Sequence, residues 1–252
     1  QSLVEPMLAA LGGTTGGQLV TGARLAVVRR QGRGFVLEFE GMDAVEVDIV
    51  LLGLPLPALR QVQFQGVDLP TSLETFIEAA GMGVHAKIVA GFNGTPWRDA
   101  GFDGEVLSNA GLQTCWDSNL LQQGDGSLTF LLGGAAASAT DPNAAEAMAN
   151  TFTAQTAPLF PGLSSARNGT AWAINWAQEA GFGGSYSCFN RGQYTAAMDH
   201  LYFEGDEEER QVAFVRNLGF IGEAFSGDYW GYMEGAVQTG WLAAQHVVDE
   251  PR

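Results

Sequence analysis

Residues 218–240 read LGFIGEAFSGDYWGYMEGAVQTG and predict a strand, a turn and a helix in succession. Apolar residues from Phe214 to Ile221 predict a buried strand. The glycine-rich run Gly222 to Gly231 predicts an irregular connection. From Tyr232 to Val248 the pattern is helical, and small residues such as Gly235 would let one face of this helix approach a sheet or a ligand closely. This stretch therefore predicts a strand–turn–helix unit that can hold a ligand at the beginning of the helix.

The rest of the chain mixes strand and helix patterns without a regular βαβ alternation. Strand patterns cover residues 24–30, 35–40, 85–92, 112–117, 127–132 and 172–176. Residues 45–54 alternate at first and then become continuously apolar, which predicts one strand that passes from a half-exposed sheet into a buried one. Helix patterns cover residues 3–11, 73–80 and 142–157, the last beginning after the N-cap signal Asp141-Pro142. The predicted fold class is α/β in the broad sense, a mixed α+β arrangement.

Composition excludes several classes of function. The 252 residues can form one large domain or two small ones, and 46% of them are hydrophobic, as in globular proteins. Acidic residues outnumber basic ones 28 to 12, which argues against binding to nucleic acid or to anionic membranes. No apolar run approaches the roughly 20 residues of a membrane helix. We therefore expect a soluble protein with no nucleic-acid or membrane partner, the cytoplasm being slightly favoured.

Common catalytic and metal-binding motifs are missing. The chain has no HExxH, CxxC, GxSxG or GxxxxGK[ST] sequence. Its three histidines, His85, His200 and His246, do not have metal-ligand spacing, so we predict no metal site. Cys115 and Cys188 allow at most one disulfide, and we expect two free thiols. Because Gln1 is not an initiator methionine, we expect a processed, truncated or excised chain.

The strand–turn–helix unit resembles the closing flavin-binding segment of the flavin-containing amine oxidase family, which includes monoamine, polyamine and L-amino-acid oxidases. Gly222-Glu223 corresponds to the family's GE dipeptide, and residues 231–237 match its GYMEGAV run at all seven positions. The resemblance implies the C-terminal part of a two-domain, FAD-dependent amine oxidase fold. Helix N-termini carry unpaired N–H groups and a partial positive charge, which suits the O2 and N1 edge of a flavin.

The resemblance also implies which residues contact the cofactor. Glu223 corresponds to the carboxylate that binds ribityl or ribose hydroxyls, and Leu25, in a hairpin spanning residues 22–39, would read the adenine through its backbone. Residues 56–60, LPALR, are similar to the family's stretch after a buried strand. The implied cofactor contacts are Leu25, Trp176, Gly222, Glu223, Gly231, Tyr232, Met233 and Ala236.

Lys87 is the only lysine in the chain and the first implied catalytic residue. Residues 82–89, MGVHAKIV, resemble the strand that carries the family's lysine, and Pro96-Trp97 follows at the family's spacing. That lysine holds a water against flavin N5. The implied role of Lys87 is proton handling when reduced flavin meets oxygen, for which a compact ammonium group is suited.

Tyr186 and Tyr232 are the other two implied catalytic residues. Asn175-Trp176 followed by residues 183–186, GGSY, resembles the monoamine oxidase stretch NW…SGGCY. Tyr186 and Tyr232 would then be two aromatic walls beside the substrate nitrogen. Ser185 replaces the cysteine that bonds the flavin in monoamine oxidases, so the resemblance implies non-covalent FAD.

A second departure from the family concerns length. The family begins with a GxGxxG Rossmann unit, which this chain lacks, so the resemblance covers nearly the whole chain but about half of a family member. It implies an FAD-binding portion over residues 1–76 and 179–252 and a substrate-binding domain over residues 77–178. Alone, such a chain would expose apolar surface and hold FAD poorly.

Three functions remain open. The first is the C-terminal chain of an FAD-dependent oxidase that deaminates an amine or L-amino acid, passes a hydride to flavin and reduces O2 to H2O2, together with a separate N-terminal chain or fragment. The second is a non-catalytic remnant that serves as a binding or scaffold protein. The third is a flavin dehydrogenase of the same fold. An amino-acid substrate would need a cation for its carboxylate, and Arg98 and Arg191 are candidates.

Overall fold

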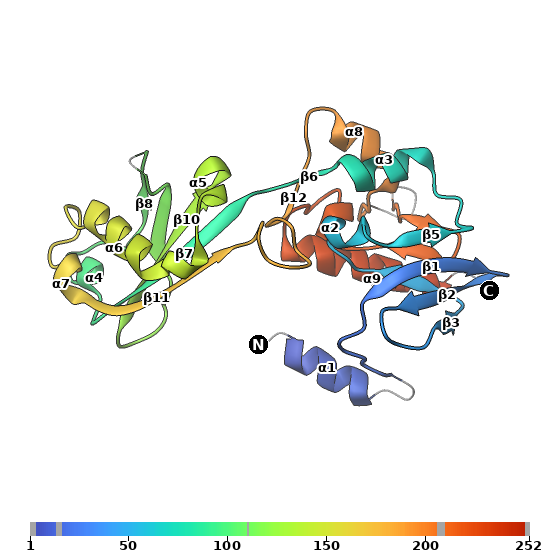
Figure 1. Cartoon of the computed structure of the whole chain (residues 1–252), viewed down its shortest axis with the longest axis horizontal. Coiled ribbons are helices and arrows are strands. Elements are labelled where there is room, and N and C mark those ends of the chain that lie inside the picture. The colour runs from blue at the N-terminus through green and yellow to red at the C-terminus, as the bar shows by residue number, and fades with distance from the viewer. Residues whose placement is uncertain (1–3, 14–16, 110, 206–209, 250–252) are drawn as a thin grey trace.

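The computed structural model describes residues 4–13, 17–109, 111–205 and 210–249, which form two bodies joined by a narrow connection (Figure 1). We call residues 17–80 together with 189–249 the two-segment body, and residues 84–175 the single-segment body. The connection contains β6 (Gly81–Met82) and β12 (Ser187–Cys188), which pair antiparallel. Each body has its own hydrophobic cluster.

The two-segment body is built on two sheets. One has the order β3-β2-β1-β5 and consists of β3 (Val45–Val47), β2 (Gly34–Phe39), β1 (Leu25–Gln31) and β5 (Gln63–Gln65). The other has the order β13-β14-β4 and consists of β13 (Phe214–Val215), β14 (Leu218–Phe220) and β4 (Val50–Leu52), with β14 and β4 parallel. The helices are α2 (Leu56–Leu59), α3 (Thr71–Ala79), α8 (Gln193–Ala197) and α9 (Met233–Asp249), with 3-10 turns η2 (Met198–His200) and η3 (Glu223–Phe225). Helix α1 (Val4–Gly13) lies apart from both sheets (Figure 1).

Two predicted strands are wrong in this body. Residues 214–221 form the hairpin β13–β14, because Arg216 adopts a left-handed φ of 58° and the chain reverses at Arg216-Asn217. Residues 45–54 form two strands in different sheets, β3 and β4. The side-chain amide of Asn217 donates to the Asp48 carbonyl (3.1 Å), and the backbone carbonyl of Asn217 accepts from the Val50 N–H (3.0 Å). The turn Arg216-Asn217 therefore lies at both departures from the predicted strands.

The single-segment body contains an antiparallel sheet with the order β11-β7-β10-β9-β8. Its strands are β11 (Arg167–Asn175), β7 (His85–Phe92), β10 (Gly126–Gly133), β9 (Thr114–Asp117) and β8 (Val106–Leu107). Helices α4 (Pro96–Asp99), α5 (Gly134–Ser138), α6 (Ala145–Thr156) and α7 (Leu163–Ala166) and the turn η1 (Pro142–Ala144) complete it, with α5 and α6 packed against β7. Strand β11 begins five residues before the predicted strand.

Burial alternates strictly along β7. Ala86, Ile88, Ala90 and Phe92 are buried, whereas the residues between them are partly exposed. Successive side chains of a strand point to opposite faces of the sheet. The buried residues of β7 therefore face the helices, and His85 and Lys87 lie on the other face. This second face forms part of the candidate site.

Two further observations bear on the sequence predictions. Both cysteines are free: Cys115 is buried and Cys188 is exposed. Burial raises the pKa of the Cys115 thiol to about 12. Among the described helices, none has a span long and apolar enough to cross a lipid bilayer.

Candidate functional site

Three cavities share lining residues and run from the two-segment body to the single-segment body. The first has a volume of about 830 Å³, the second about 260 Å³ and the third about 330 Å³. Gly53 and Leu54 line both the first and the second cavity, and Ser185 lines both the second and the third. The three cavities are therefore neighbours, and most of the predicted site residues line one of them.

The first cavity lies beside the β1–β2 hairpin. Leu25, Leu37 and Phe39 line one side of it, and β4 with Gly53 and Leu54 lines the other. The hairpin forms because Gly32 supplies the left-handed φ of 59° at its turn, which sets the register that pairs Arg30 with Phe35. Leu25 thus lies in this cavity, away from Lys87.

The second cavity contains Gly222, Glu223 and Ala236 of the strand–turn–helix unit. The Glu223 carboxylate accepts three hydrogen bonds. The Ser187 N–H donates to Oε1 (2.8 Å), and the Ser187 hydroxyl (2.6 Å) and the Gly231 N–H (2.8 Å) donate to Oε2. Because each carboxylate oxygen can accept about two hydrogen bonds, Oε1 retains a position for a ligand hydroxyl.

The beginning of α9 is fixed against this cavity. The Gly222 N–H donates to the Thr239 hydroxyl (2.9 Å), which links the GE turn to the helix. A Cβ at Gly235 would lie 2.3 Å from the Tyr229 carbonyl oxygen, so only glycine permits this close approach. Tyr232 and Met233 are 71% and 75% exposed and line none of the three cavities.

Lys87 lies in the third cavity with Trp116, Leu131, Trp176 and Tyr186. Its ammonium nitrogen is 5.9 Å from the centroid of the Trp116 ring, within the range of a cation–π contact. It forms no salt bridge with any residue that the structure describes. Asn175, whose buried amide donates to the Ala137 carbonyl (2.9 Å), fixes the chain just before Trp176. The structure therefore brings Lys87, Trp176 and Tyr186 together around one cavity.

His85 and Ser185 also belong to this cavity, although the sequence did not identify either as a site residue. The Ser185 hydroxyl donates to the Gly83 carbonyl (3.0 Å) and lies 2.8 Å from His85 Nδ1. Since the hydroxyl proton is used, Nδ1 carries the proton and Nε2 is an acceptor. The Tyr186 hydroxyl lies 3.4 Å from that Nε2, and the two rings stack with centroids 5.0 Å apart. His85 thereby orients Tyr186.

The pKa shifts of His85 and Tyr186 both favour the uncharged side chain. Burial and, to a smaller degree, the charge of Lys87 lower the pKa of His85. Burial raises the pKa of Tyr186, and Cys188 and Tyr232 add to the shift. A Cβ at Gly231 would lie 3.6 Å from the Tyr186 ring, so the turn before α9 packs against this tyrosine.

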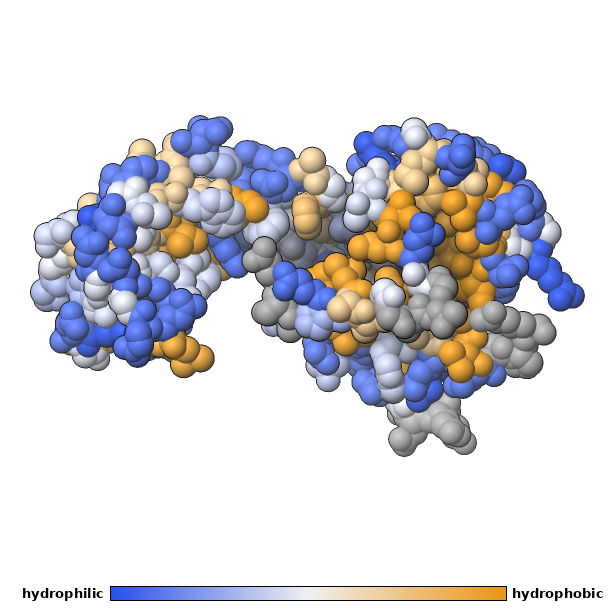
Figure 2. Space-filling model, turned by 90° about the horizontal axis from the view of Figure 1, so that it is seen from below, coloured by the Kyte–Doolittle hydropathy of each residue, from blue (hydrophilic) through white to orange (hydrophobic). Residues whose placement is uncertain are grey.

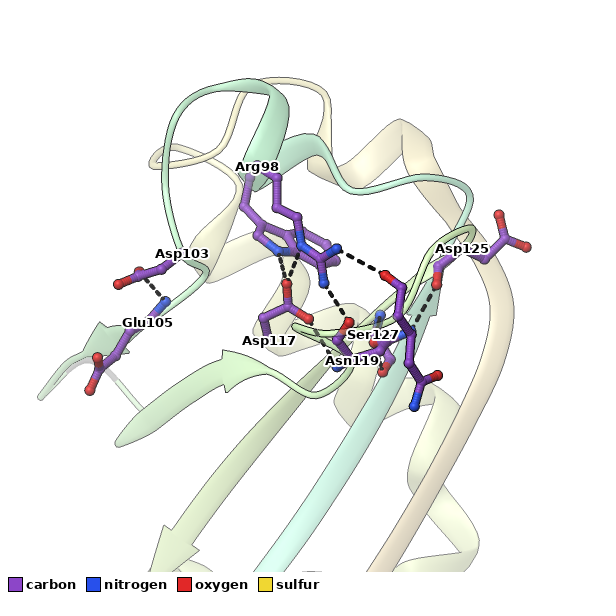
Figure 3. A network of polar contacts seen from close by, with 9 residues as sticks. Arg98, Asp103, Glu105, Asp117, Asn119, Asp125 and Ser127 are labelled. Carbon is purple, nitrogen blue, oxygen red and sulfur yellow. Dashed lines mark hydrogen bonds and ion pairs between the residues drawn. The ribbon is translucent and has the colours of Figure 1, made fainter.

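Arg98 does not face the third cavity. Its Nε donates to Asp117 Oδ2 (2.6 Å), which also accepts from the Trp97 indole (2.7 Å) (Figure 3). A further Arg98 nitrogen donates to the Asn119 carbonyl (2.7 Å). Burial alone would raise the pKa of Asp117, but hydrogen bonds from Arg98 and Trp97 outweigh it, and the pKa lies below its usual value. Arg98 is thus already paired with the carboxylate of Asp117, and it does not face the cavity in which a substrate carboxylate would lie.

Comparison with known proteins decides the family. The family model described as flavin containing amine oxidoreductase matches residues 1–248. The chain belongs to this family. Polyamine oxidase 4 of Oryza sativa subsp. japonica is 25% identical over 228 residues, which are 88% of this chain and 43% of that protein. The chain therefore spans less than half the length of this relative.

Solved structures of amine oxidases share the fold of this chain. Putrescine oxidase bound to putrescine superposes with a TM-score of 0.75 at 18% identity, covering 90% of this chain and 49% of that one. Cyclohexylamine oxidase from Brevibacterium oxydans IH-35A superposes with a TM-score of 0.75 at 20% identity, covering 89% and 48%. The mixed α/β fold is thus that of amine oxidases, and the chain spans about half of it.

The second cavity fits a flavin. Gly53 and Gly222 leave bare backbone along its wall, which suits a flat ring, and Glu223 Oε1 can accept a hydrogen bond from a hydroxyl group. The first residues of α9 present the positive end of the helix dipole nearby. Ser185 in the wall has no thiol, so nothing at this position can form the cysteine linkage.

Proposed function

We propose that this chain is the C-terminal part of an FAD-dependent amine oxidase, binds FAD non-covalently, and acts with an N-terminal polypeptide that supplies the GxGxxG unit. The observation that carries the proposal is Ser185, which lines both the cavity of the GE turn and the cavity of Lys87. A cofactor held at Glu223 and an amine held at Lys87 would therefore meet at this residue. The match over residues 1–248 and the lengths of the relatives support the same conclusion.

FAD, when bound, would accept a hydride from the carbon beside the amine nitrogen and return the electrons to O2 as H2O2. Residues of this chain would do the rest. Trp176 and Tyr186 exclude water and orient a neutral amine. His85 holds the Tyr186 hydroxyl through Nε2. Lys87 would hold a water and move a proton during reoxidation, whereas Leu25 and Glu223 would bind the adenine and ribityl ends.

Native mass spectrometry of the purified protein tests the two-chain arrangement and the cofactor. We expect a complex that contains this chain, a second polypeptide and one FAD. A lone chain without flavin would contradict the proposal and would favour the scaffold alternative.

Substitution of Lys87 tests the oxidase chemistry. We expect Lys87→Met to slow reoxidation of the flavin by O2 about a hundredfold, the scale of one proton-transfer group, and to change its reduction by amine far less. Stopped-flow absorbance in the two half-reactions measures both rates, with Lys87→Arg as the control that keeps the charge. Equal slowing of both half-reactions would remove this role, and slow reoxidation of the unsubstituted protein would favour a dehydrogenase.

A further inference from the structure

His85, the first residue of β7, has a hydrogen-bond partner at each of its two ring nitrogens. Nδ1 lies 2.8 Å from the Ser185 hydroxyl, and Nε2 lies 3.4 Å from the Tyr186 hydroxyl. The Ser185 hydroxyl has one proton and donates it to the Gly83 carbonyl (3.0 Å), so Nδ1 of neutral His85 is a donor and Nε2 is an acceptor. The Tyr186 hydroxyl therefore donates its proton to His85.

This bond decides what the Tyr186 hydroxyl can offer to a ligand. A hydroxyl whose proton is already donated presents only lone pairs to its other neighbours. Because Tyr186 lines the third cavity, an amine bound there would donate an N–H to the Tyr186 oxygen and keep its nitrogen lone pair free. When a hydride leaves the neighbouring carbon for the flavin, that lone pair forms the second C–N bond of the iminium product. Neutral His85 therefore suits amine oxidation.

Protonation of His85 would reverse the bond. An imidazolium carries a proton on both nitrogens, so Nε2 becomes the donor and the Tyr186 oxygen becomes its acceptor. The Tyr186 proton then turns toward the cavity, where it would donate to the lone pair of the amine. A lone pair held in a hydrogen bond is less available to form the second C–N bond, so hydride transfer would slow.

The surroundings of this pair favour the neutral imidazole. Burial and, to a smaller degree, the charge of Lys87 on the same strand lower the pKa of His85 from 6.5. Burial raises the pKa of Tyr186, so its hydroxyl keeps its proton. The other elements packed against His85 contribute Gly133 of β10 and Trp176 after β11, neither of which titrates. The titratable side chains that act on the pair from all elements are Lys87, Cys188 and Tyr232.

We propose that His85 is a positioning residue that makes the Tyr186 hydroxyl an acceptor toward the substrate amine, and that protonation of His85 turns this hydroxyl into a donor and slows amine oxidation. The inference rests on the amine oxidase function proposed above and adds control by pH to it. His85 acts through Tyr186 and does not itself contact the amine.

The rate of flavin reduction as a function of pH tests the proposal. Stopped-flow absorbance of the flavin-containing protein is measured at saturating amine, with whichever of benzylamine, n-butylamine and 1,4-diaminobutane reduces the flavin fastest. We expect the limiting rate to fall about tenfold as pH decreases through the His85 pKa. His85→Phe keeps a ring against Tyr186 but no acceptor, and should be about tenfold slower above that pKa. His85→Gln supplies an amide oxygen as acceptor, so it should restore part of the rate and lose the fall at low pH.

His200→Gln is the matched control, because His200 bonds to Ser72 (2.7 Å) in the two-segment body and should leave the pH profile unchanged. A fall at low pH that persists in His85→Gln, or equal rates for His85→Phe and His85→Gln, would overturn the inference alone. Failure of every amine to reduce the flavin would overturn the proposed function and this inference with it.

A second readout needs neither amine nor turnover. Tyr186→Phe keeps the aromatic ring but removes the donor to Nε2, so neutral His85 loses a hydrogen bond and its proton affinity should rise about fivefold. NMR titration of the imidazole carbons measures this pKa. Tyr194→Phe is the control, because the Tyr194 hydroxyl donates to the Gly227 carbonyl (3.0 Å) in the two-segment body. A His85 pKa that Tyr186→Phe leaves unchanged would overturn the inference.

Discussion

Both bodies of this chain expose some apolar residues, but among the described residues only in the two-segment body do several of them share one side of a long helix. In the single-segment body, α5 and α6 cover one sheet face, and its buried carboxylate, Asp117, is paired with Arg98. In the two-segment body, the outer side of α9 exposes Met233, Val237, Trp241 and Val248, between 48% and 80% of each side chain. On the face seen in Figure 2, apolar side chains gather over the two-segment body, whereas the single-segment body is mostly hydrophilic there.

This difference indicates that the two-segment body has a surface suited to binding another polypeptide, formed by the edge strand β4 and the exposed side of α9. The order β13-β14-β4 leaves β4 at the edge of a sheet in which it pairs parallel with β14. Parallel strands are normally covered on both faces, and contiguous exposed apolar surface marks an interaction site. The N-terminal polypeptide of the proposed function would supply this cover, whereas the single-segment body would fold without it.

The largest expected effect is a loss of stability in the single-segment body. Asp117→Ala removes the acceptor of Arg98 and of the Trp97 indole, and we expect a loss of about 3 kcal/mol in the free energy of unfolding, at the lower end for a broken buried pair because Arg98 is partly hydrated. Urea unfolding followed by circular dichroism measures it. Glu38→Ala is the control in the other body, because Arg29 and Glu38 are both about 40% exposed, and it should cost at most about 1 kcal/mol.

The same residue predicts a pH dependence. Because the folded-state pKa of Asp117 is lowered, its contribution to stability is fully present above the unfolded value of about 3.9 and is lost as pH falls through the folded pKa. Asp117→Asn should flatten the acid limb of the stability profile below about pH 4. An unchanged acid limb in this variant would show that other carboxylates control acid unfolding.

A smaller effect distinguishes the binding of the N-terminal polypeptide from the stability of this chain alone. Val237→Lys puts a charge on the apolar side of α9, where the residue is 62% exposed. We expect the stability of the chain alone to change by less than about 0.5 kcal/mol, while association with the N-terminal polypeptide weakens by about 2 kcal/mol, about thirtyfold in Kd. Leu107→Lys, at a residue of the single-segment body that is 77% exposed, should change neither quantity. Equal weakening by both variants would show a general effect of charge.

Sequence reasoning found the parts of the fold that are encoded locally. Strand β7 and helix α9 follow from alternation and helical spacing, and both lie within one residue of the predicted bounds. The split of residues 214–221 was missed because an arginine, not a glycine, adopts the left-handed turn at Arg216. The division of residues 45–54 between two sheets depends on Asn217, which is remote in sequence and leaves no local signal.

The site shows the same limit. Lys87 and Tyr186 were predicted as site residues because contiguous family patterns surround them, and the structure places both in one cavity. His85 was set aside as a histidine without metal-ligand spacing. Its hydrogen bond to Ser185 joins residues 100 positions apart, which meet because backbone hydrogen bonds link Gly83 to Ser185 and Tyr186. The assignment of FAD binding to residues 1–76 and 179–252, and of substrate binding to residues 77–178, stays a prediction.

The smallest expected effect compares one histidine from each body. Burial lowers the pKa of His85 and of His200, with Lys87 adding to the shift at His85 and Asp199 opposing it at His200. Both contributions to stability are therefore present above the unfolded pKa of about 6.5 and are lost as pH falls below it. NMR titration of the imidazole carbons resolves the two groups. We expect Lys87→Met to move the His85 pKa upward and to leave the His200 pKa unchanged, because His200 bonds instead to Ser72 (2.7 Å) in the other body. If both histidines shift together, the substitution has disturbed the connection between the bodies, and their independence, on which the whole comparison depends, is contradicted.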